Sequence, residues 1–275
     1  MRKPMQDDAI ETVKRYYDET AQQEWERLSA HPFEFILTTR MMDTYIRPGD
    51  SILDIGGGPG RYAIHYAGKG CRVVLADLSE GNVALARQKA GEAGVALEAV
   101  ACNCLELDRL ELGRFDHVFL MGPLYHLQRE DDRIRAVETA LRHLKPGGKL
   151  YASFILAFAG LIYDLQHAGF LAADAANPAT AALLDAVEEG RDYLGPGFTA
   201  VYFYHQNNIL PFMRQFPLDK LHLFGQEGFL APNKYELVNR DERETACWLE
   251  LARRYCELPE LLSWSEHAMY IGQKR

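Results

Sequence analysis

The chain has 275 residues, 48% of them hydrophobic and 25% charged, which is typical of a globular protein with one large domain or one domain and an added subdomain. Its formal net charge of −9 argues against a nucleic-acid partner, because binding to phosphates requires a basic face. The sequence has no polybasic block, and its longest apolar stretch, 150–163, is too short to span a bilayer, so we expect no membrane partner.

The first predicted element is a helix near the N-terminus. Its apolar residues recur every three or four positions, which is the spacing of one helix face. We assign residues 1–46 to an N-terminal helical region ahead of a sheet. The residues of the apolar face are Ile10, Val13, Tyr17, Ala21, Trp25 and Leu28.

From residue 50 onward, short β-branched runs alternate with helical patterns, which predicts an α/β fold with a parallel sheet. Ser79 is the expected N-cap of one helix, and Gly94 is expected to close it. Lys145-Pro-Gly-Gly148 should end the third helix. The predicted strands are 51–55, 72–76, 97–102, 116–121 and 149–155, and the predicted helices are 61–67, 80–93 and 131–144.

The alternation stops after residue 155. Residues 156–200 are too long for a plain connection between a strand and a helix, and their Ala-rich and aromatic segments have helical spacing. We interpret this segment as an inserted helical lid or substrate cap. The sheet is expected to resume at 220–224 and to close with 267–273, so that residues 47–155 and 201–275 form the main domain.

The most informative stretch is 51–63. An apolar run leads into Asp54 and then into glycines at alternate positions, Gly56, Gly58 and Gly60, before a helical segment. Glycine permits a sharp turn and lets a ligand approach the backbone more closely than any Cβ would allow. A strand that ends in such a loop, with a helix N-terminus behind it, predicts a nucleoside-cofactor site at the carboxyl edge of a parallel sheet.

The order Asp54-x-Gly56-x-Gly58-x-Gly60 resembles motif I of the class I S-adenosylmethionine (SAM) methyltransferases. As a bare string, Gly58-x-Gly60-x-x-Ala63 also fits the NAD fingerprint. Asp54 separates the two cofactors, because a carboxylate suits a cationic, amine-bearing ligand and would repel a pyrophosphate. The loop therefore favours SAM, and an NAD-linked oxidoreductase is the alternative.

Segments 16–21, 115–127 and 144–148 extend the resemblance to a broad bacterial group of small-molecule methyltransferases. It covers nearly the whole chain and is weakest over 156–200. The resemblance implies a Rossmann-like, seven-stranded, mostly parallel sheet with an antiparallel last strand, and N-terminal helices that cover the cofactor site. It also implies SAM as the methyl donor and S-adenosylhomocysteine (SAH) as the product.

The resemblance assigns cofactor-binding roles to residues at the predicted strand ends. Asp77 would accept hydrogen bonds from the ribose hydroxyls, although it could instead be an acid at the N-terminus of the helix that Ser79 caps. Asn103 would accept a hydrogen bond from the adenine amino group, and Tyr17 would face the sulfonium. The expected cofactor-binding residues are Tyr17, Asp54, Gly56, Gly57, Gly58, Arg61, Asp77, Leu78, Asn103, Cys104 and Met121.

His126, just past the fourth predicted strand, is the candidate general base, and a purely structural role is an equal alternative. His205 and the aromatic residues of 156–200 are further candidates for the acceptor pocket. Segment 121–125 lacks the Asn/Asp-Pro-Pro-aromatic signature of enzymes that methylate nucleic-acid amines. The expected function is transfer of a methyl group from SAM to a small-molecule acceptor, and the second alternative is a non-catalytic SAM- or SAH-binding protein.

The five cysteines form no C-x-x-C pair, which predicts free thiols in a reducing compartment. Residues 1–8 contain no apolar segment of the kind found in secretory signals, so a cytoplasmic location is expected. Cys102 and Cys104 could suggest a metal, but we expect buried thiols there and predict no metal site.

Overall fold

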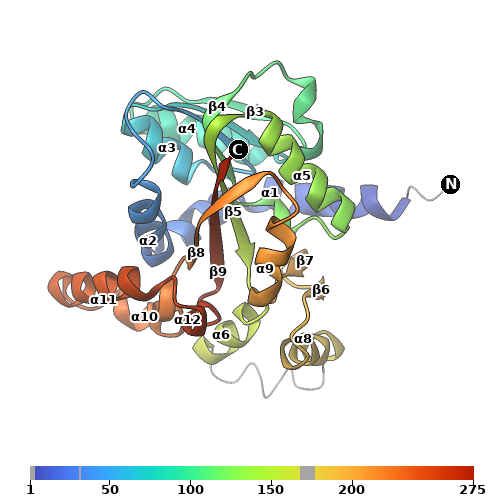
Figure 1. The fold of residues 1–275 in the computed structure, drawn as a ribbon, viewed down its shortest axis with the longest axis vertical. Helices are drawn as coiled ribbons and strands as arrows, with labels where there is room; N and C mark the ends of the chain where they lie inside the picture. Colours follow the sequence, from blue (N-terminus) through green and yellow to red (C-terminus); the bar gives the residue numbers. More distant parts are fainter. Residues whose placement is uncertain (1–3, 31, 168–176) are drawn as a thin grey trace.

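The computed structural model describes residues 4–30, 32–167 and 177–275. Its centre is a seven-stranded sheet with the strand order β3-β2-β1-β4-β5-β9-β8 (Figure 1). Neighbouring strands are parallel from β3 to β5, whereas β9 is antiparallel to both β5 and β8. The expected Rossmann-like sheet is therefore confirmed. Its strands are β1 (Ser51–Ile55), β2 (Arg72–Asp77), β3 (Glu98–Ala101), β4 (Phe115–Leu120), β5 (Leu144–Ile155), β8 (Leu218–Gly225) and β9 (His267–Lys274).

The central strands are buried on both faces, as expected for a parallel sheet covered by helices. In β1, successive side chains point to opposite faces, so Ile52 packs with Phe119 in one apolar cluster and Leu53 packs with Val118 in another. The connecting helices lie within two residues of their predicted bounds. They are α3 (Arg61–Gly68), α4 (Glu80–Glu92) and α5 (Glu130–Arg142).

The N-terminal region forms α1 (Pro4–Ala30) and α2 (Pro32–Met42). Helix α1 lies against α4, and Val13 and Ala21 of its predicted apolar face are buried. The Asp18 carboxylate accepts hydrogen bonds from Ser79 Oγ at 2.6 Å and from the Gly81 backbone N–H at 3.0 Å, which fixes α1 to the start of α4. Across the described ranges, no helix is both long and apolar enough to cross a membrane.

Three predicted boundaries differ from the structure. Strand β5 starts at Leu144 rather than at residue 149, because Lys145-Pro-Gly-Gly148 forms an irregularity within the strand where the register with β4 shifts. Strand β3 ends at Ala101, so Cys102 and Asn103 lie beyond it. Met121 likewise follows the last residue of β4.

The helical interpretation of 156–200 is wrong for its last part. The described residues form α6 (Ala159–Gln166) and α8 (Pro178–Glu188), followed by a hairpin of β6 (Tyr193–Pro196) and β7 (Ala200–Phe203). The expected boundary at residue 200 cuts through β7. Residues 168–176 of the expected lid lie outside the described residues. Strand β7 contacts α1 and the loop after β4, which places the hairpin beside the ends of the central strands.

The second half of the sheet is reached through α9 (Gln206–Met213), η3 (Gly228–Asn233), α10 (Lys234–Leu237), α11 (Glu242–Tyr255) and α12 (Pro259–Leu262). The last three helices gather at one end of the molecule (Figure 1). Because β9 is antiparallel, its first residue lies at the same edge as the last residues of the parallel strands: His267 pairs with Ile155. This edge therefore collects residues from both halves of the chain.

The N-cap of α4 should contribute measurably to stability. Ser79 is 1% exposed, and its Oγ accepts a hydrogen bond from Asn82 N while it donates to Asp18. Ser79→Ala removes both bonds and should lower the free energy of unfolding by about 1–2 kcal/mol, as measured by urea denaturation. Ser79→Thr keeps the hydroxyl and should cost less; equal losses for the two variants would contradict the capping role.

Candidate active site

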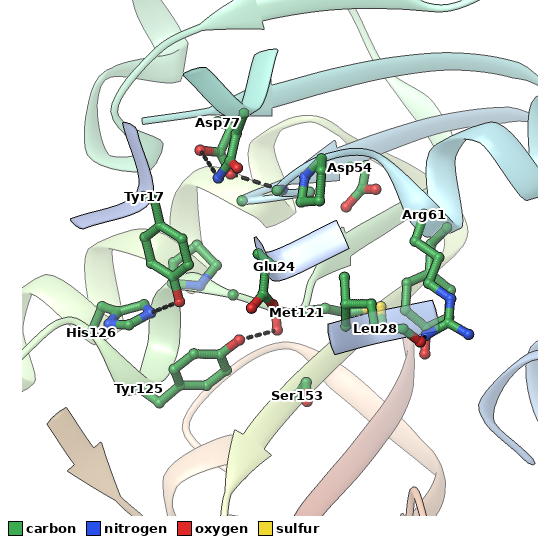
Figure 2. Close-up of a pocket in the computed structure, with 18 of the residues that line it drawn as sticks. Tyr17, Glu24, Leu28, Asp54, Arg61, Asp77, Met121, Tyr125, His126 and Ser153 are labelled. Atoms are coloured by element: carbon green, nitrogen blue, oxygen red, sulfur yellow. Dashed lines mark hydrogen bonds between the residues drawn. The ribbon is translucent and has the colours of Figure 1, made fainter. Parts of the chain in front are cut away.

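One cavity opens at the carboxyl edge of the sheet and joins the two halves of the chain. Its walls come from α1, from the loop after β1, from the residues that follow β2, β3 and β4, and from the β8 and β9 ends. In Figure 2, Asp77 and Ser153 lie at opposite ends of the cavity, with Glu24 and Met121 between them. The cavity is long enough to reach from the glycine loop to the distal half of the sheet.

The glycine loop has the geometry of a ligand cradle. Gly58 has a φ of +56°, and a Cβ added there would meet only Asn82 Nδ2, at 4.0 Å. That position is open space beside the cavity. At Gly57, by contrast, an added Cβ would lie 2.7 Å from Asp54 Oδ2. Gly57 therefore allows the loop to pack on Asp54, and Gly58 leaves room for a ligand to approach the backbone.

Asp54 is a buried acid without a counter-charge. It is 2% exposed, and its Oδ2 has no hydrogen-bond partner among the described residues. Burial and the nearby charge of Asp77 raise its pKa to about 7. A buried carboxylate that lacks a partner is unfavourable by several kcal/mol unless a cation or donor arrives, so Asp54 fits a ligand with an ammonium group.

Asp77 is held by donors of the protein itself. Its Oδ2 accepts from Gly58 N at 2.8 Å, and its Oδ1 accepts from Ser79 N at 2.9 Å and from Asn82 Nδ2 at 3.2 Å. The bond to Ser79 N is the contact expected of an acid at a helix N-terminus. Oδ1 already accepts two hydrogen bonds, but Oδ2 accepts only one and keeps a free lone pair. Since Asp77 lines the cavity, a ribose hydroxyl can still be bound there.

The remaining expected cofactor residues also line the cavity, among them Leu78, Asn103, Cys104 and Met121. Asn103 caps the 3₁₀ helix η1 (Cys104–Arg109), because its Oδ1 accepts from Leu105 N at 3.0 Å. The Met121 carbonyl accepts from Tyr125 Oη at 3.1 Å. Their roles toward adenine and methionine stay predictions.

Tyr17 and His126 are joined across the cavity. The Tyr17 hydroxyl and His126 Nε2 lie 3.0 Å apart (Figure 2). His126 Nδ1 lies 3.2 Å from Thr199 Oγ1 of the hairpin. Burial lowers the pKa of His126 to about 4. His126 is thus neutral and has both ring nitrogens bonded to hydroxyls, and it ties α1 to the β6–β7 hairpin.

Glu24 and Arg27 of α1 line the cavity and were not predicted from the sequence. Glu24 lines the cavity and accepts two hydrogen bonds from Arg27, at 2.6 and 2.8 Å. Arg61, which was expected, lies over the Phe35 ring at 4.3 Å and donates to the Leu28 carbonyl. The i,i+3 spacing of Glu24 and Arg27 was visible in the sequence, but it is equally typical of exposed helix faces.

A group of polar residues at the far end of the cavity was also missed; we call it the distal cluster. Gln226 and Glu227 follow β8, Glu266 precedes β9, and His267 is the first residue of β9. Their antiparallel strand brings them to the cavity edge. The distal cluster comprises Glu34, Ser153, Gln226, Glu227, Lys234, Glu266 and His267, all of which line the cavity.

The distal cluster is largely neutralised by its own cations. Lys234 Nζ donates to both oxygens of Glu266, at 2.6 and 2.7 Å, and His267 pairs with Glu227. Glu227, Glu266 and His267 offer three possible metal-ligand atoms within 4.8 Å of one another. Since Lys234 and the His267 ring already satisfy these carboxylates, a metal ion would have to displace them.

The acceptor candidates of 156–205 do not reach the cavity. Of the aromatic residues of 156–200 that the structure describes, none lines it; Tyr193 is buried beside β7 and Phe198 is 46% exposed. His205 instead caps α9 and accepts from Asn207 N. The apolar wall comes largely from the N-terminal helices, through Ile10, Val13, Leu28 and Phe33.

Residues 52–148 match a family model described as a methyltransferase domain. They contain the glycine loop, the buried Asp54 and the strands that carry both. Residues 52–148 are thus a methyltransferase domain. Within that domain, the geometry of Asp54 and Gly58 fits SAM and SAH, whose ammonium group would neutralise the unpartnered carboxylate.

Curated relatives of the methyltransferase domain differ in the atom that they methylate. The chain is 31% identical over 127 residues to a ubiquinone biosynthesis O-methyltransferase of Hahella chejuensis, with 43% of this chain and 52% of that protein covered. It is 34% identical over 110 residues to a ubiquinone/menaquinone biosynthesis C-methyltransferase of Pseudomonas putida, with 38% and 41% covered. The chain thus spans about half the length of the curated relatives it matches, or less.

Solved structures share the whole fold. A magnesium protoporphyrin IX methyltransferase from Synechocystis, solved with bound SAH, has a TM-score of 0.58 and 14% sequence identity. The match covers 97% of this chain and 100% of that chain. At this identity the likeness establishes the fold, and the acceptor has to be argued from the cavity itself.

Proposed function

We propose that the protein transfers a methyl group from SAM to a small-molecule acceptor. The observation that carries the proposal is the buried, unpartnered Asp54 carboxylate beside the open position at Gly58. A sulfonium-bound methyl group supplies the electrophile when SAM is bound. The protein's task is then to align the acceptor with that methyl group and to exclude water.

Each end of the cofactor has a matching part of the cavity in this proposal. Asp54 holds the ammonium group, and Asp77 accepts from the ribose hydroxyls. Asn103 and the Cys104 backbone contact adenine, and Met121 lies beside the methionine chain. Support comes from their common placement along the loop edge of the cavity, together with Tyr17, Gly56, Gly57, Gly58, Arg61 and Leu78.

The acceptor is proposed to be a small molecule that enters from the distal half of the cavity. The net charge of −9 disfavours nucleic acid. All five cysteines are free thiols, which supports the proposed cytoplasmic location. Segment 156–200 is proposed to act as a substrate cap, since Thr199 at its end lies within hydrogen-bond distance of His126, which lines the cavity.

Incubation of the protein with methyl-labelled SAM and a small-molecule extract tests the activity. We expect label to appear in at least one compound, with SAH formed in equal amount. Tight SAM binding without any labelled compound would favour the non-catalytic alternative. An NAD-linked oxidoreductase is disfavoured because the buried carboxylate of Asp54 would repel a pyrophosphate.

His126 should affect turnover more than cofactor affinity. His126→Ala removes the tie between α1 and the hairpin, so we expect turnover of labelled SAM to fall about tenfold or more while SAH affinity changes less. Tyr17→Phe removes only one of the two hydrogen bonds and should have a smaller effect. Unchanged turnover in His126→Ala would show that this residue has only a local structural role.

A further inference from the structure

Glu227 and His267 form a hydrogen-bonded pair in the distal cluster. His267 Nδ1 lies 2.6 Å from Glu227 Oε1, and the His267 backbone N–H donates to Glu227 Oε2 at 3.0 Å. Ser265 Oγ donates to the same oxygen. The Glu227 side chain is only 3% exposed, so the carboxylate is held in one position behind the imidazole ring.

The other ring nitrogen of His267 is available to a ligand. With the Nδ1 proton directed at Glu227, Nε2 is the acceptor of the neutral ring, and it makes no hydrogen bond to any residue that the structure describes. His267 lines the cavity, and its side chain is 25% exposed. A carboxylate that fixes the tautomer of an accessible histidine is the arrangement that general bases use.

The position of the pair suits the acceptor rather than the cofactor. His267 pairs with Ile155 of β5, two residues after Ser153, which lies across the cavity from Asp77 (Figure 2). A cofactor held by Asp54 and Asp77 occupies the other half of the sheet edge. The distal cluster is therefore the polar surface that remains for an acceptor.

Charged groups from four elements surround His267: Glu34 on α2, Glu227 before η3, Lys234 on α10 and Glu266 before β9. Burial lowers the pKa of His267, but the nearby carboxylates, Glu227 first, outweigh it and raise the pKa above its ordinary value. Burial would raise the pKa of Glu227, yet its contact with His267 lowers it to about 2. Glu227 is therefore the ionised member of the pair, and His267 is the member that can accept a proton.

We propose that His267 is the general base that takes the proton from a hydroxyl group of the methyl acceptor, with Glu227 as its positioning residue. This inference rests on the proposed function. It specifies the acceptor as a small, largely apolar molecule that carries an alcohol or phenol hydroxyl. An amine attacks through its existing lone pair and loses its proton afterwards, whereas a hydroxyl is a weak nucleophile until its proton leaves. The apolar cavity wall of Val13, Leu28 and Phe33 suits such a body.

In this step, the hydroxyl proton moves to His267 Nε2 as the acceptor oxygen forms a bond to the methyl carbon. The carbon–sulfur bond breaks, and its electron pair stays on sulfur as the thioether of SAH. The positive charge that the sulfonium loses then resides on the His267 imidazolium. Glu227 stabilises that charge until the proton passes to water.

para-Nitrophenol tests this assignment, because its phenolate absorbs visible light and its neutral form does not. The protein is saturated with SAH and titrated with the probe one pH unit below the probe's own pKa. We expect the bound probe to be ionised, which corresponds to at least a tenfold gain in acidity. In His267→Ala the bound probe should stay neutral, and in Glu227→Gln the phenolate fraction should fall and its pH midpoint should move.

A second histidine–glutamate pair provides the matched control. His222 Nδ1 lies 2.9 Å from Glu257 Oε1, and His222 is not among the residues that line the cavity, so His222→Ala should keep the phenolate signal. Calorimetric titration with SAH distinguishes failure of the base assignment from failure of the proposed function. If SAH binds but the probe remains neutral or unbound, or if His267→Ala keeps the signal, the base assignment is overturned. Failure of the unmodified protein to bind SAH would contradict the proposed function itself.

Discussion

Asp77→Ala should weaken SAH binding at least tenfold, or by about 1.4 kcal/mol or more, in a calorimetric titration. The variant loses the acceptor proposed for the ribose. It also loses the carboxylate that accepts from Gly58 N, Ser79 N and Asn82 Nδ2, so the glycine loop loses its support. Both losses should weaken SAH binding.

Comparison of adenosine with dideoxyadenosine separates the two effects. In the unmodified protein, loss of the ribose hydroxyls should weaken binding, and in Asp77→Ala it should make little further difference. Asn82→Ala is the matched control, because it removes one donor to Asp77 and leaves the carboxylate in place. If the two nucleosides differ equally in both proteins, Asp77 supports the loop and does not bind the ribose.

Asp54→Asn should remove most of the pH dependence of SAH binding. Asp54 has a pKa of about 7 in the ligand-free protein, raised by burial and by the charge of Asp77. Above this pH the carboxylate is ionised and can pair with the ammonium group, at a gain of about 1.5–3 kcal/mol. Below it, a proton must leave first, so affinity should fall toward tenfold per pH unit.

The effect of Asp54 on the stability of the ligand-free protein should have the opposite pH dependence, because it decreases as the pH rises. The pKa of Asp54 is higher in the folded state than in the unfolded state, so protonation of this carboxyl stabilises the fold. This contribution to the free energy of unfolding is fully present at a pH below the ordinary pKa of an aspartate, and it is lost as the pH rises toward about 7. Asp54→Asn should therefore raise the melting temperature of the free protein above that pH and have little effect well below it. SAH affinity with the same pH profile in the variant would rule out Asp54 as the ammonium site.

The fold of the methyltransferase domain could be predicted because its local signals agree with one another. β1 is an apolar run that ends at the glycine loop, and Ser79 caps α4 as its sequence position indicates. The β6–β7 hairpin could not be predicted in the same way. Its first strand contains Gly195 and Pro196, which normally mark a turn, and it exists because Tyr193 packs against Phe203 in a small apolar cluster.

The candidate site was predictable on the cofactor side and not on the distal side. Every expected cofactor residue lines the cavity, because all but Tyr17 follow directly from a strand, a loop or a helix start that the sequence marks. Glu227 and His267 lie forty residues apart and meet only through the antiparallel pairing of β8 and β9. No local pattern indicates that their side chains share one hydrogen bond.

The glycine loop and Asp54 are expected to bind an adenosyl cofactor with an ammonium group. Calorimetric titration of the protein with SAM, SAH and NADH in parallel tests it most directly. We expect binding of SAM and SAH and no heat of binding for NADH. Binding of NADH, with none for either adenosyl ligand, would contradict it.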